Sequence, residues 1–294
     1  MKPSPFTYHR PESVDEALAI LAKYNDAKIL AGGQSLVPLM ALRLGQPEHI
    51  IDIGHLSELN YIREVDGGVA IGALARHADV EDSSIVASAA PLMSKAMCHI
   101  GHRAIRNRGT VCGSLAHADP AAELPAVALA AGAIFVARSV RGERTIDAAD
   151  FFTGYLSSAL DGDEMLTEVR FPAWPRRTGA AVVELSRRHG DYALVGLAAA
   201  IQLAADGTVD ACALSFFGVA STPIRVADAE TSLLRRSPSA DAFAVASTIV
   251  ADYLDPPDDN HGSRAYRKHL AGVLTRRALD EAVTNASHND RTIA

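Results

Sequence analysis

Two glycine-containing loops are the segments of this sequence best suited to chemistry. The first turns at Gly32-Gly33 between an apolar run and a helix start, and the second surrounds Gly113. A strand that turns at glycines into a helix directs consecutive backbone N–H groups, and the helix dipole, toward one point. Glycine also lets the backbone approach an anion without an intervening Cβ. The two loops comprise Ile29, Leu30, Ala31, Gly32, Gly33, Gln34, Ser35 and Leu36, and Thr110, Val111, Cys112, Gly113 and Ser114.

This pattern predicts an anion site, to which the hydroxyl groups of Ser35, Thr110 and Ser114 add donors. Neither loop fits the dinucleotide fingerprint G-x-G-x-x-G or the phosphate loop G-x-x-x-x-G-K-[ST], which disfavours a Rossmann dehydrogenase and a P-loop NTPase. The alternative interpretation is that the glycines only reverse the chain. Each loop by itself leaves both interpretations open.

Other constellations offer less. His117-Ala118-Asp119 fits part of a two-histidine, one-carboxylate iron site. However, Asp119 directly precedes Pro120, which is typical of a helix N-cap. The cysteines form no Cys-x-x-Cys pair for zinc or an iron–sulfur cluster, and no G-x-S-x-G motif occurs. We therefore expect neither a metal site nor a catalytic side chain, so any redox centre must be a bound organic cofactor.

The composition excludes several classes of protein. Of the 294 residues 48% are hydrophobic and 21% charged, as in soluble globular proteins. The net charge of −7 is opposite in sign to that of a general nucleic-acid binder. The longest apolar runs are too short for a membrane span, and the first residues lack the apolar stretch of a signal peptide. We expect a cytoplasmic protein without a nucleic-acid partner.

The elements around the first loop indicate a small parallel α/β unit. Ser13 and Glu16 form a capping box for a helix to Tyr24. Strands are predicted over Ala27–Ala31 and His49–Ile53, with a second helix starting near Ser35.

The rest of the chain is predicted as strands and helices in an α+β arrangement. A hairpin over 61–74, a helix over 84–98, an irregular segment over 101–118 and a helix from Pro120 to about Ala131 come first. Strands over 133–139 and 167–171 precede a boundary at 172–179, where two prolines and a glycine interrupt the pattern. Beyond it we predict strands over 181–186, 196–203 and 209–217, with Asp206-Gly207 as a turn, and helices over 239–254 and 263–286.

Three motifs give the sequence a specific resemblance. They are Ala31–Ser35 (AGGQS), Ile100–Glu123 (IGHRAIRNRGTVCGSLAHADPAAE) and Arg187–Gly196 (RRHGDYALVG). Together they resemble the FAD-binding medium subunit of molybdenum hydroxylases, the family of aerobic carbon monoxide dehydrogenase and of the xanthine dehydrogenase flavin domain. The resemblance covers nearly the whole chain.

The family resemblance implies a fold and a set of cofactor contacts. It implies an FAD-binding domain of the vanillyl-alcohol-oxidase (PCMH) type over 1–175, with subdomains 1–57 and 58–175. A C-terminal domain of the carbon monoxide dehydrogenase flavoprotein type over 176–287 and a tail over 288–294 complete the chain. The two glycine loops would bind the FAD diphosphate, and Glu123 would face the adenosine part. Leu166 and Ile100 would touch the cofactor, and Tyr192 would lie against the flavin ring.

Two positions depart from the family pattern. Cys112 stands where a glycine is common, and we interpret its thiol as packing rather than redox chemistry. Glu184 stands where some relatives carry lysine, which argues against a cationic contact to the flavin there. For Arg187 and Arg188, ion pairs, a partner interface and simple solvation remain alternatives.

The resemblance implies an electron-transfer subunit. A large subunit with the molybdenum cofactor would hydroxylate the substrate, and a small subunit with two [2Fe–2S] clusters would pass electrons to FAD on this chain and on to an external acceptor. The assembly would be (αβγ)2. The alternatives are a free-standing FAD-dependent oxidoreductase of the same fold and a scaffold that binds no FAD.

Overall fold

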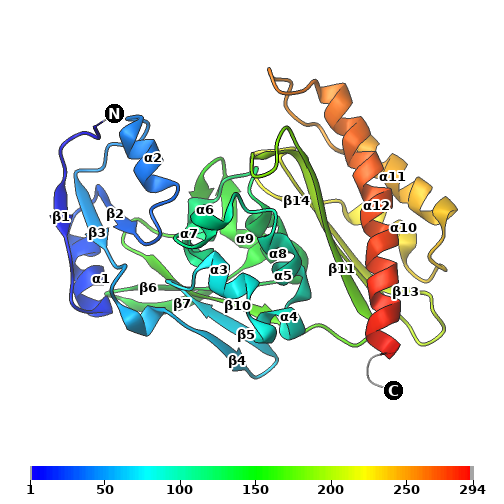
Figure 1. The fold of residues 1–294 in the computed structure, drawn as a ribbon, viewed down its shortest axis with the longest axis horizontal. Helices are drawn as coiled ribbons and strands as arrows, with labels where there is room; N and C mark the ends of the chain where they lie inside the picture. The colour runs from blue at the N-terminus through cyan, green and yellow to red at the C-terminus, as the bar shows by residue number, and fades with distance from the viewer. Residues whose placement is uncertain (1, 292–294) are drawn as a thin grey trace.

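The computed structural model describes residues 2–291. Three units follow one another along the longest axis (Figure 1). They are a small N-terminal sheet, a central five-stranded sheet with helices, and a C-terminal four-stranded sheet covered by long helices. Helices and strands are largely segregated in the second and third units, which confirms the predicted α+β class.

The N-terminal unit is a three-stranded parallel sheet in the order β1-β3-β2. Ser13 Oγ accepts a hydrogen bond from the Glu16 N–H at 3.2 Å, so the predicted start of the first helix is confirmed. The two predicted strands are also confirmed, whereas β1 was not predicted. The elements are β1 (Thr7–His9), α1 (Val14–Lys23), β2 (Ala27–Leu30), α2 (Leu36–Ala41) and β3 (His49–Asp52).

The central unit is an antiparallel sheet in the order β4-β5-β10-β6-β7. Helices α7 and α8 contact this sheet, and α3 and α4 precede them along the chain. The strands are β4 (Ile62–Val65), β5 (Gly68–Gly72), β6 (Ile134–Ser139), β7 (Gly142–Asp147) and β10 (Met165–Pro172), with a separate pair β8 (Phe152–Gly154) and β9 (Ser157–Ser158). The helices are η1 (Ser57–Leu59), α3 (His77–Glu81), α4 (Ser84–Ala89), α5 (Pro91–Met97), α6 (Arg103–Arg106), α7 (Val111–His117), α8 (Glu123–Ala131) and α9 (Ala148–Phe151).

Three predictions for this unit were wrong. The helix expected over 84–98 is two helices, because Pro91 cannot continue the hydrogen bonding of α4 and instead begins α5. The segment 101–118, expected to be irregular, contains α6 and α7. Asp119 does not cap a helix at Pro120: its Oδ1 accepts from the Ala121 N–H at 2.9 Å, which closes a turn, and α8 starts only at Glu123.

The C-terminal unit is an antiparallel sheet in the order β11-β12-β13-β14, and α12 lies along β11 and β12. The three predicted strands and the two predicted helices are confirmed, although α12 continues past Ala286 to Arg291. Residues 292–294 of the predicted tail lie outside the described residues. The elements are β11 (Thr178–Ser186), β12 (Ala193–Leu203), β13 (Val209–Phe217), β14 (Ile224–Arg225), α10 (Ala227–Leu233), α11 (Ala240–Tyr253) and α12 (Arg264–Arg291).

The central and C-terminal units share a packed seam. Helices α5 and α8 contact β11, β12 and β13. Phe217 and Val182 of the C-terminal sheet belong to the same buried cluster as Leu124 and Met93 of the central unit. Burial of apolar side chains across this seam stabilises one arrangement of the two units.

Among the helices described, none has the length and apolar composition that crossing a bilayer requires.

Candidate functional site

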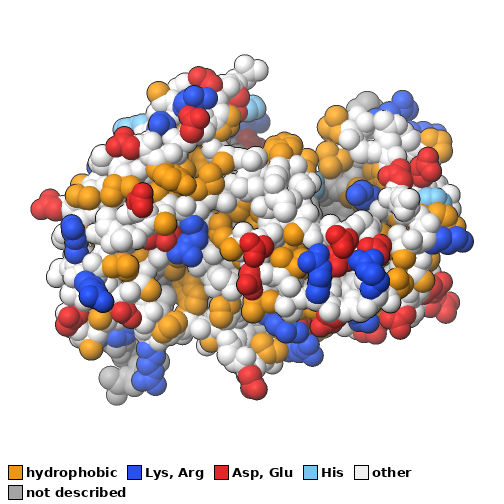
Figure 2. Space-filling model, turned by 180° about the vertical axis from the view of Figure 1, so that it is seen from behind, with side chains coloured by type: hydrophobic (Ala, Val, Ile, Leu, Met, Phe, Trp, Pro, Cys, Tyr) orange, Lys and Arg blue, Asp and Glu red, His pale blue; other side chains and the backbone are white. Residues whose placement is uncertain are grey.

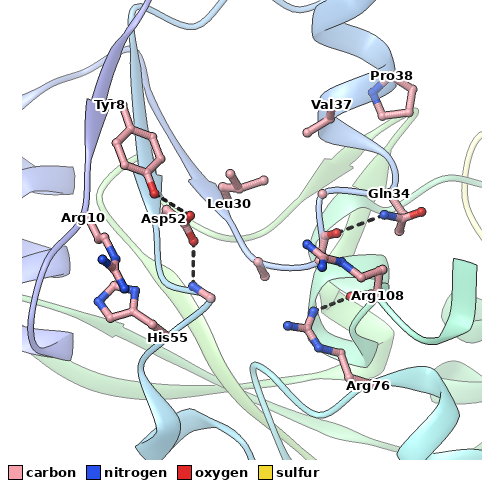
Figure 3. Close-up of a pocket in the computed structure, with 14 residues that line it drawn as sticks. Tyr8, Arg10, Leu30, Gln34, Val37, Pro38, Asp52, His55, Arg76 and Arg108 are labelled. Atoms are coloured by element: carbon pink, nitrogen blue, oxygen red, sulfur yellow. Dashed lines mark hydrogen bonds between the residues drawn. The ribbon is translucent and has the colours of Figure 1, made fainter.

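A cavity of about 890 Å³ lies between the N-terminal and central units. Its volume is in the range of pockets that take small molecules and cofactors. Figure 3 shows the Gly32 loop with Gln34, Arg76 and Arg108 on one side, and Tyr8, Asp52, Arg10 and His55 on the other. The lining residues are Tyr8, Arg10, Leu30, Ala31, Gly32, Gly33, Gln34, Val37, Pro38, Asp52, Gly54, His55, Arg76 and Arg108.

The first glycine loop forms one edge of this cavity. It connects the end of β2 at Leu30 to the start of α2 at Leu36, and Gly33 has a φ of +73°, which favours glycine. Within the described part of the chain, the backbone N–H groups from Gly32 through Ser35 donate to no protein acceptor. Because α2 has only six residues, its dipole contributes little. The free amides themselves are the donors that an anion would meet here.

The second glycine loop lies directly behind the first. A Cβ at Gly32 would lie 2.8 Å from Gly109 Cα and closer still to the Arg108 carbonyl oxygen, so the two backbones touch. The Thr110 Oγ1 accepts from the Gly113 N–H at 3.1 Å and caps α7. Arg108 lines the cavity, whereas none of the residues from Thr110 to Ser114 does.

The side chains of the second loop point into the core. Val111 and Cys112 are buried, and the Cys112 thiol donates to the Ile71 carbonyl oxygen of β5 at 3.6 Å. Burial raises the pKa of the Cys112 thiol, so it stays protonated. On the other side of the loop, His77 packs against Gly109 and is held neutral because burial lowers its pKa to about 4. The thiol at position 112 is a packing group on this evidence, as its sequence suggested.

Three arginines and one carboxylate give the cavity a positive balance. Arg10, Arg76 and Arg108 line it, against Asp52 alone. Arg76 is half-buried and its Nη1 donates to the Arg108 carbonyl oxygen. Burial, together with the nearby Arg108 charge, lowers the pKa of the Arg76 guanidinium, which remains protonated at neutral pH.

The opposite wall carries a carboxylate that is held in place by hydrogen bonds. Asp52 accepts from the Tyr8 hydroxyl at 2.7 Å and from the Gly54 N–H at 2.8 Å. Asp52 ends β3, next to the end of the parallel strand β2. Ligands of parallel α/β sheets bind at the carboxyl ends of the strands, and that rule could have identified Asp52 from the sequence. No comparable signal in the sequence marks Tyr8 or Arg76.

The remaining predicted residues do not line this cavity. Ile29, Ser35 and Leu36 flank the Gly32 loop, and Ile100 and Leu166 are buried in the apolar core. Glu123 is buried at the start of α8, where burial raises its pKa to about 7. Tyr192 is 62% exposed, and its hydroxyl hydrogen-bonds to Asp119 in the electrostatic neighbourhood of Glu123. Glu123 and Tyr192 thus form a second group, separate from the cavity.

The histidine–aspartate motif has a structural explanation. Asp119 is occupied by the turn to Ala121 and by Tyr192. Among the side chains that the structure describes, those of residues 2–287, no group of three or more His, Cys, Asp or Glu is arranged to hold a metal ion.

Comparisons with known proteins place this geometry in a class. Residues 4–174 match the family described as "FAD binding domain in molybdopterin dehydrogenase". Residues 180–282 match the family described as "CO dehydrogenase flavoprotein C-terminal domain". The chain therefore belongs to the FAD-binding domain family of molybdopterin dehydrogenases.

Particular relatives are similar over their full length. The chain is 42% identical to the "6-hydroxypseudooxynicotine dehydrogenase complex subunit alpha" of Paenarthrobacter nicotinovorans, covering 97% of each chain. It is 38% identical to the "carbon monoxide dehydrogenase medium chain" of Hydrogenophaga pseudoflava, covering 96% of this chain and 98% of the relative. A solved structure of carbon monoxide dehydrogenase from that organism superimposes with a TM-score of 0.93 at 39% identity, over 97% of this chain and 99% of the other. The predicted family and fold are confirmed.

The residues present fit the FAD that the family binds. FAD carries a doubly charged diphosphate, and the cavity offers free amides and an excess of cations. Gly32 leaves no space for a side chain between the two loops, as a close backbone contact requires. Leu30, Val37 and Pro38 supply an apolar wall of the kind that receives a flat heterocycle.

Proposed function

We propose that this chain is the FAD-carrying, electron-transfer subunit of a multi-subunit molybdenum hydroxylase. Because that complex is an oxidoreductase, the chain is an oxidoreductase subunit. The family match to an FAD-binding domain over residues 4–174 supports the cofactor. The names of the relatives, which are a "subunit alpha" and a "medium chain" of dehydrogenase complexes, support the place in a complex. The observation that carries the proposal is the contact of the two glycine loops beside a cavity with free amides.

When bound, FAD accepts electrons singly from an iron–sulfur partner and releases them in pairs to an external acceptor. The residues of this chain bind and orient it. The amides from Gly32 through Ser35 would hold the diphosphate. The second loop, Thr110 to Ser114, would support them through the residues that precede it, Arg108 and Gly109, which contact Gly32. Glu123 would accept hydrogen bonds from ribose hydroxyls, and Tyr192 would cover the ring and exclude water.

The proposed role of this chain as the carrier of FAD implies partner subunits that carry the other redox centres. A large subunit would carry the molybdenum cofactor and a small subunit two [2Fe–2S] clusters, in a cytoplasmic assembly of stoichiometry (αβγ)2. We also propose the domain division at residues 175 and 176, with the subdomain division at 57 and 58. The change of sheet between β10 and β11 supports the first of these divisions.

Purification of the complex from its native source tests the proposal. We expect a yellow chain that releases FAD on denaturation and co-elutes with two further subunits containing molybdenum and iron. A colourless chain would favour a scaffold. Flavin without metal-containing partners, together with substrate turnover by the chain alone, would favour a free-standing flavoenzyme. The two relatives named above are instead described as a complex subunit and a medium chain.

A further inference from the structure

The positive charge of the cavity is local. The whole chain carries a net charge of −7. On the face shown in Figure 2, acidic and basic side chains alternate among apolar ones. Against this background, three arginines and a single aspartate line one cavity. Like charges repel one another and are costly to desolvate, so such a cluster indicates that an anion belongs there.

Arg76 and Arg108 are the two arginines nearest the first glycine loop. Both lie on the side of the cavity formed by that loop (Figure 3). Among residues 2–287, whose side chains the structure describes, neither forms an ion pair, whereas Arg103 and Arg106 both pair with Glu81. Two guanidinium groups therefore remain available beside four free amides.

Arg76 also connects the two loops. Its Nη1 donates to the Arg108 carbonyl oxygen, which is the atom that Gly32 faces most closely. Its backbone forms a bridge with Thr110. The Arg108 carbonyl oxygen carries a partial negative charge that would repel an anion in the cavity. The hydrogen bond from Arg76 offsets this charge. The other nitrogens of Arg76 bond to no described residue.

Resting on the FAD function proposed above, we propose that Arg76 and Arg108 form a cationic clamp on the FAD diphosphate, and that Arg76 is in addition the positioning residue for the second loop. The charge of the two guanidinium groups matches that of the diphosphate. The planar fork of each guanidinium suits two phosphate oxygens at once. The amides of the first loop then bind the diphosphate beside the two guanidinium groups, on the same side of the cavity.

Titration of the flavin-free, full-length chain with FAD tests the clamp. We expect Arg76→Gln and Arg108→Gln each to weaken FAD binding by about 10- to 100-fold, as for the loss of a hydrogen bond to a charged group. Raising the salt concentration should weaken FAD binding to the wild type more than to either variant, because fewer charges remain to be screened. ADP, which carries the same diphosphate, should lose affinity for the variants by a similar factor.

Two further variants separate charge from structure. Arg76→Lys keeps the charge but presents it on a single nitrogen, so we expect it to retain the salt dependence of the wild type with an intermediate affinity. Arg236→Gln removes an exposed arginine of the C-terminal unit and should leave FAD affinity unchanged. Circular dichroism and the unfolding temperature report whether each variant folds.

The outcomes distinguish the two proposals. Wild type that binds FAD, with glutamine variants of equal affinity and equal salt dependence, overturns the clamp and leaves the FAD function intact. Variants that lose affinity with an unchanged salt dependence also overturn the clamp, because the arginines would then act only through the fold. A wild-type chain that binds neither FAD nor ADP overturns the FAD function and the clamp with it.

Discussion

The two glycine loops both lead into a helix but differ in how their amides are used. In the first loop the N–H groups from Gly32 through Ser35 meet no acceptor within the described residues, and the cavity lies in front of them. In the second, the Gly113 N–H donates to Thr110 Oγ1 and the Val111 N–H donates to the Ala75 carbonyl oxygen. A glycine turn therefore provides an anion site only where its amides are left without partners.

The second loop has a different task, which is to hold the first in place. Its backbone at Arg108 and Gly109 lies against Gly32, and its side chains at positions 111 and 112 anchor it in the core. The first loop is polar and half-exposed, whereas the second is buried and closed by hydrogen bonds. On the function proposed above, binding and support are divided between two segments far apart in the sequence.

The largest effect is expected where the loops touch. Gly32→Ala would place a Cβ 2.8 Å from Gly109 Cα and still nearer the Arg108 carbonyl oxygen. Both are backbone atoms, so neither can move aside without displacing the second loop. We expect the loops to separate, with a loss of about 1–3 kcal/mol in the free energy of unfolding. The purified protein should contain almost no FAD, as measured by flavin absorbance.

Gly45→Ala is the matched control for this substitution. A Cβ there would meet nothing within 4 Å. It should therefore leave both the flavin content and the unfolding temperature unchanged. Full flavin content in Gly32→Ala would show that contact between the loops is not needed for binding.

A smaller effect should come from a charge placed within the first loop. Gly33→Asp puts a carboxylate beside the free amides, and we expect FAD affinity to fall by about 10- to 100-fold. Gly33→Asn has nearly the same shape and, like Asp, tolerates the φ of +73° found there. The Asn variant should bind FAD more tightly than the Asp variant in titrations of the flavin-free chain. Equal affinities would mean that the loop senses bulk and not charge.

Local features of the fold could be predicted from the sequence. The cap of α1 depends on Ser13 and Glu16, three residues apart, and the strands beside the first loop contain the apolar pairs Ile29-Leu30 and Ile50-Ile51. The family motifs identified the two loops. The break between α4 and α5 was missed although Pro91 was visible, because the apolar pattern continues across it. Strand β1 is only three residues long, which is too short for a pattern.

Features that depend on distant contacts could not be predicted. Arg76 contacts the Arg108 carbonyl oxygen across 32 residues of sequence. Tyr8 reaches Asp52 across 44 residues. Nothing in the spacing of these residues marks them as neighbours. Tyr8 and Asp52 become neighbours when β1 pairs with β3, and Arg76 and Arg108 become neighbours when the central unit folds. The cavity with a positive balance forms where these two units meet, in a chain of net charge −7.

The burial of Glu123 at the start of α8 should also be measurable, as a pH dependence of the free energy of unfolding. Burial, with the negative charges of Glu184 and Asp119, raises the pKa of Glu123 from 4.5 to about 7, while His99 opposes the shift. The stability that the protonated carboxyl contributes is therefore complete below about pH 4.5 and is lost as the pH rises through 7. The useful quantity is the free energy of unfolding of the flavin-free Glu123→Gln variant minus that of the wild type. This difference should be larger at pH 8 than in acid by roughly 2–3 kcal/mol.

Chemical denaturation at a series of pH values measures this difference. The variant-minus-wild-type difference is the useful quantity, because the other titrating groups are common to both proteins. A difference that stays constant from acid to alkaline pH would mean that Glu123 is solvated and ionised in the folded chain. The contrast between the open first loop and the closed second loop would then not extend to α8, the helix that follows the second loop.

The smallest effect is expected at the cap of the second loop. Thr110→Val keeps the shape of the side chain and removes the oxygen that accepts from the Gly113 N–H, so we expect a loss of about 1–2 kcal/mol in the free energy of unfolding. Thr110→Ser keeps the oxygen and should lose less. If the second loop only supports the first, FAD affinity in Thr110→Val should fall by less than in Gly33→Asp. A larger fall would mean that the Thr110 hydroxyl binds the cofactor directly, and the division between a binding loop and a supporting loop would have to be abandoned.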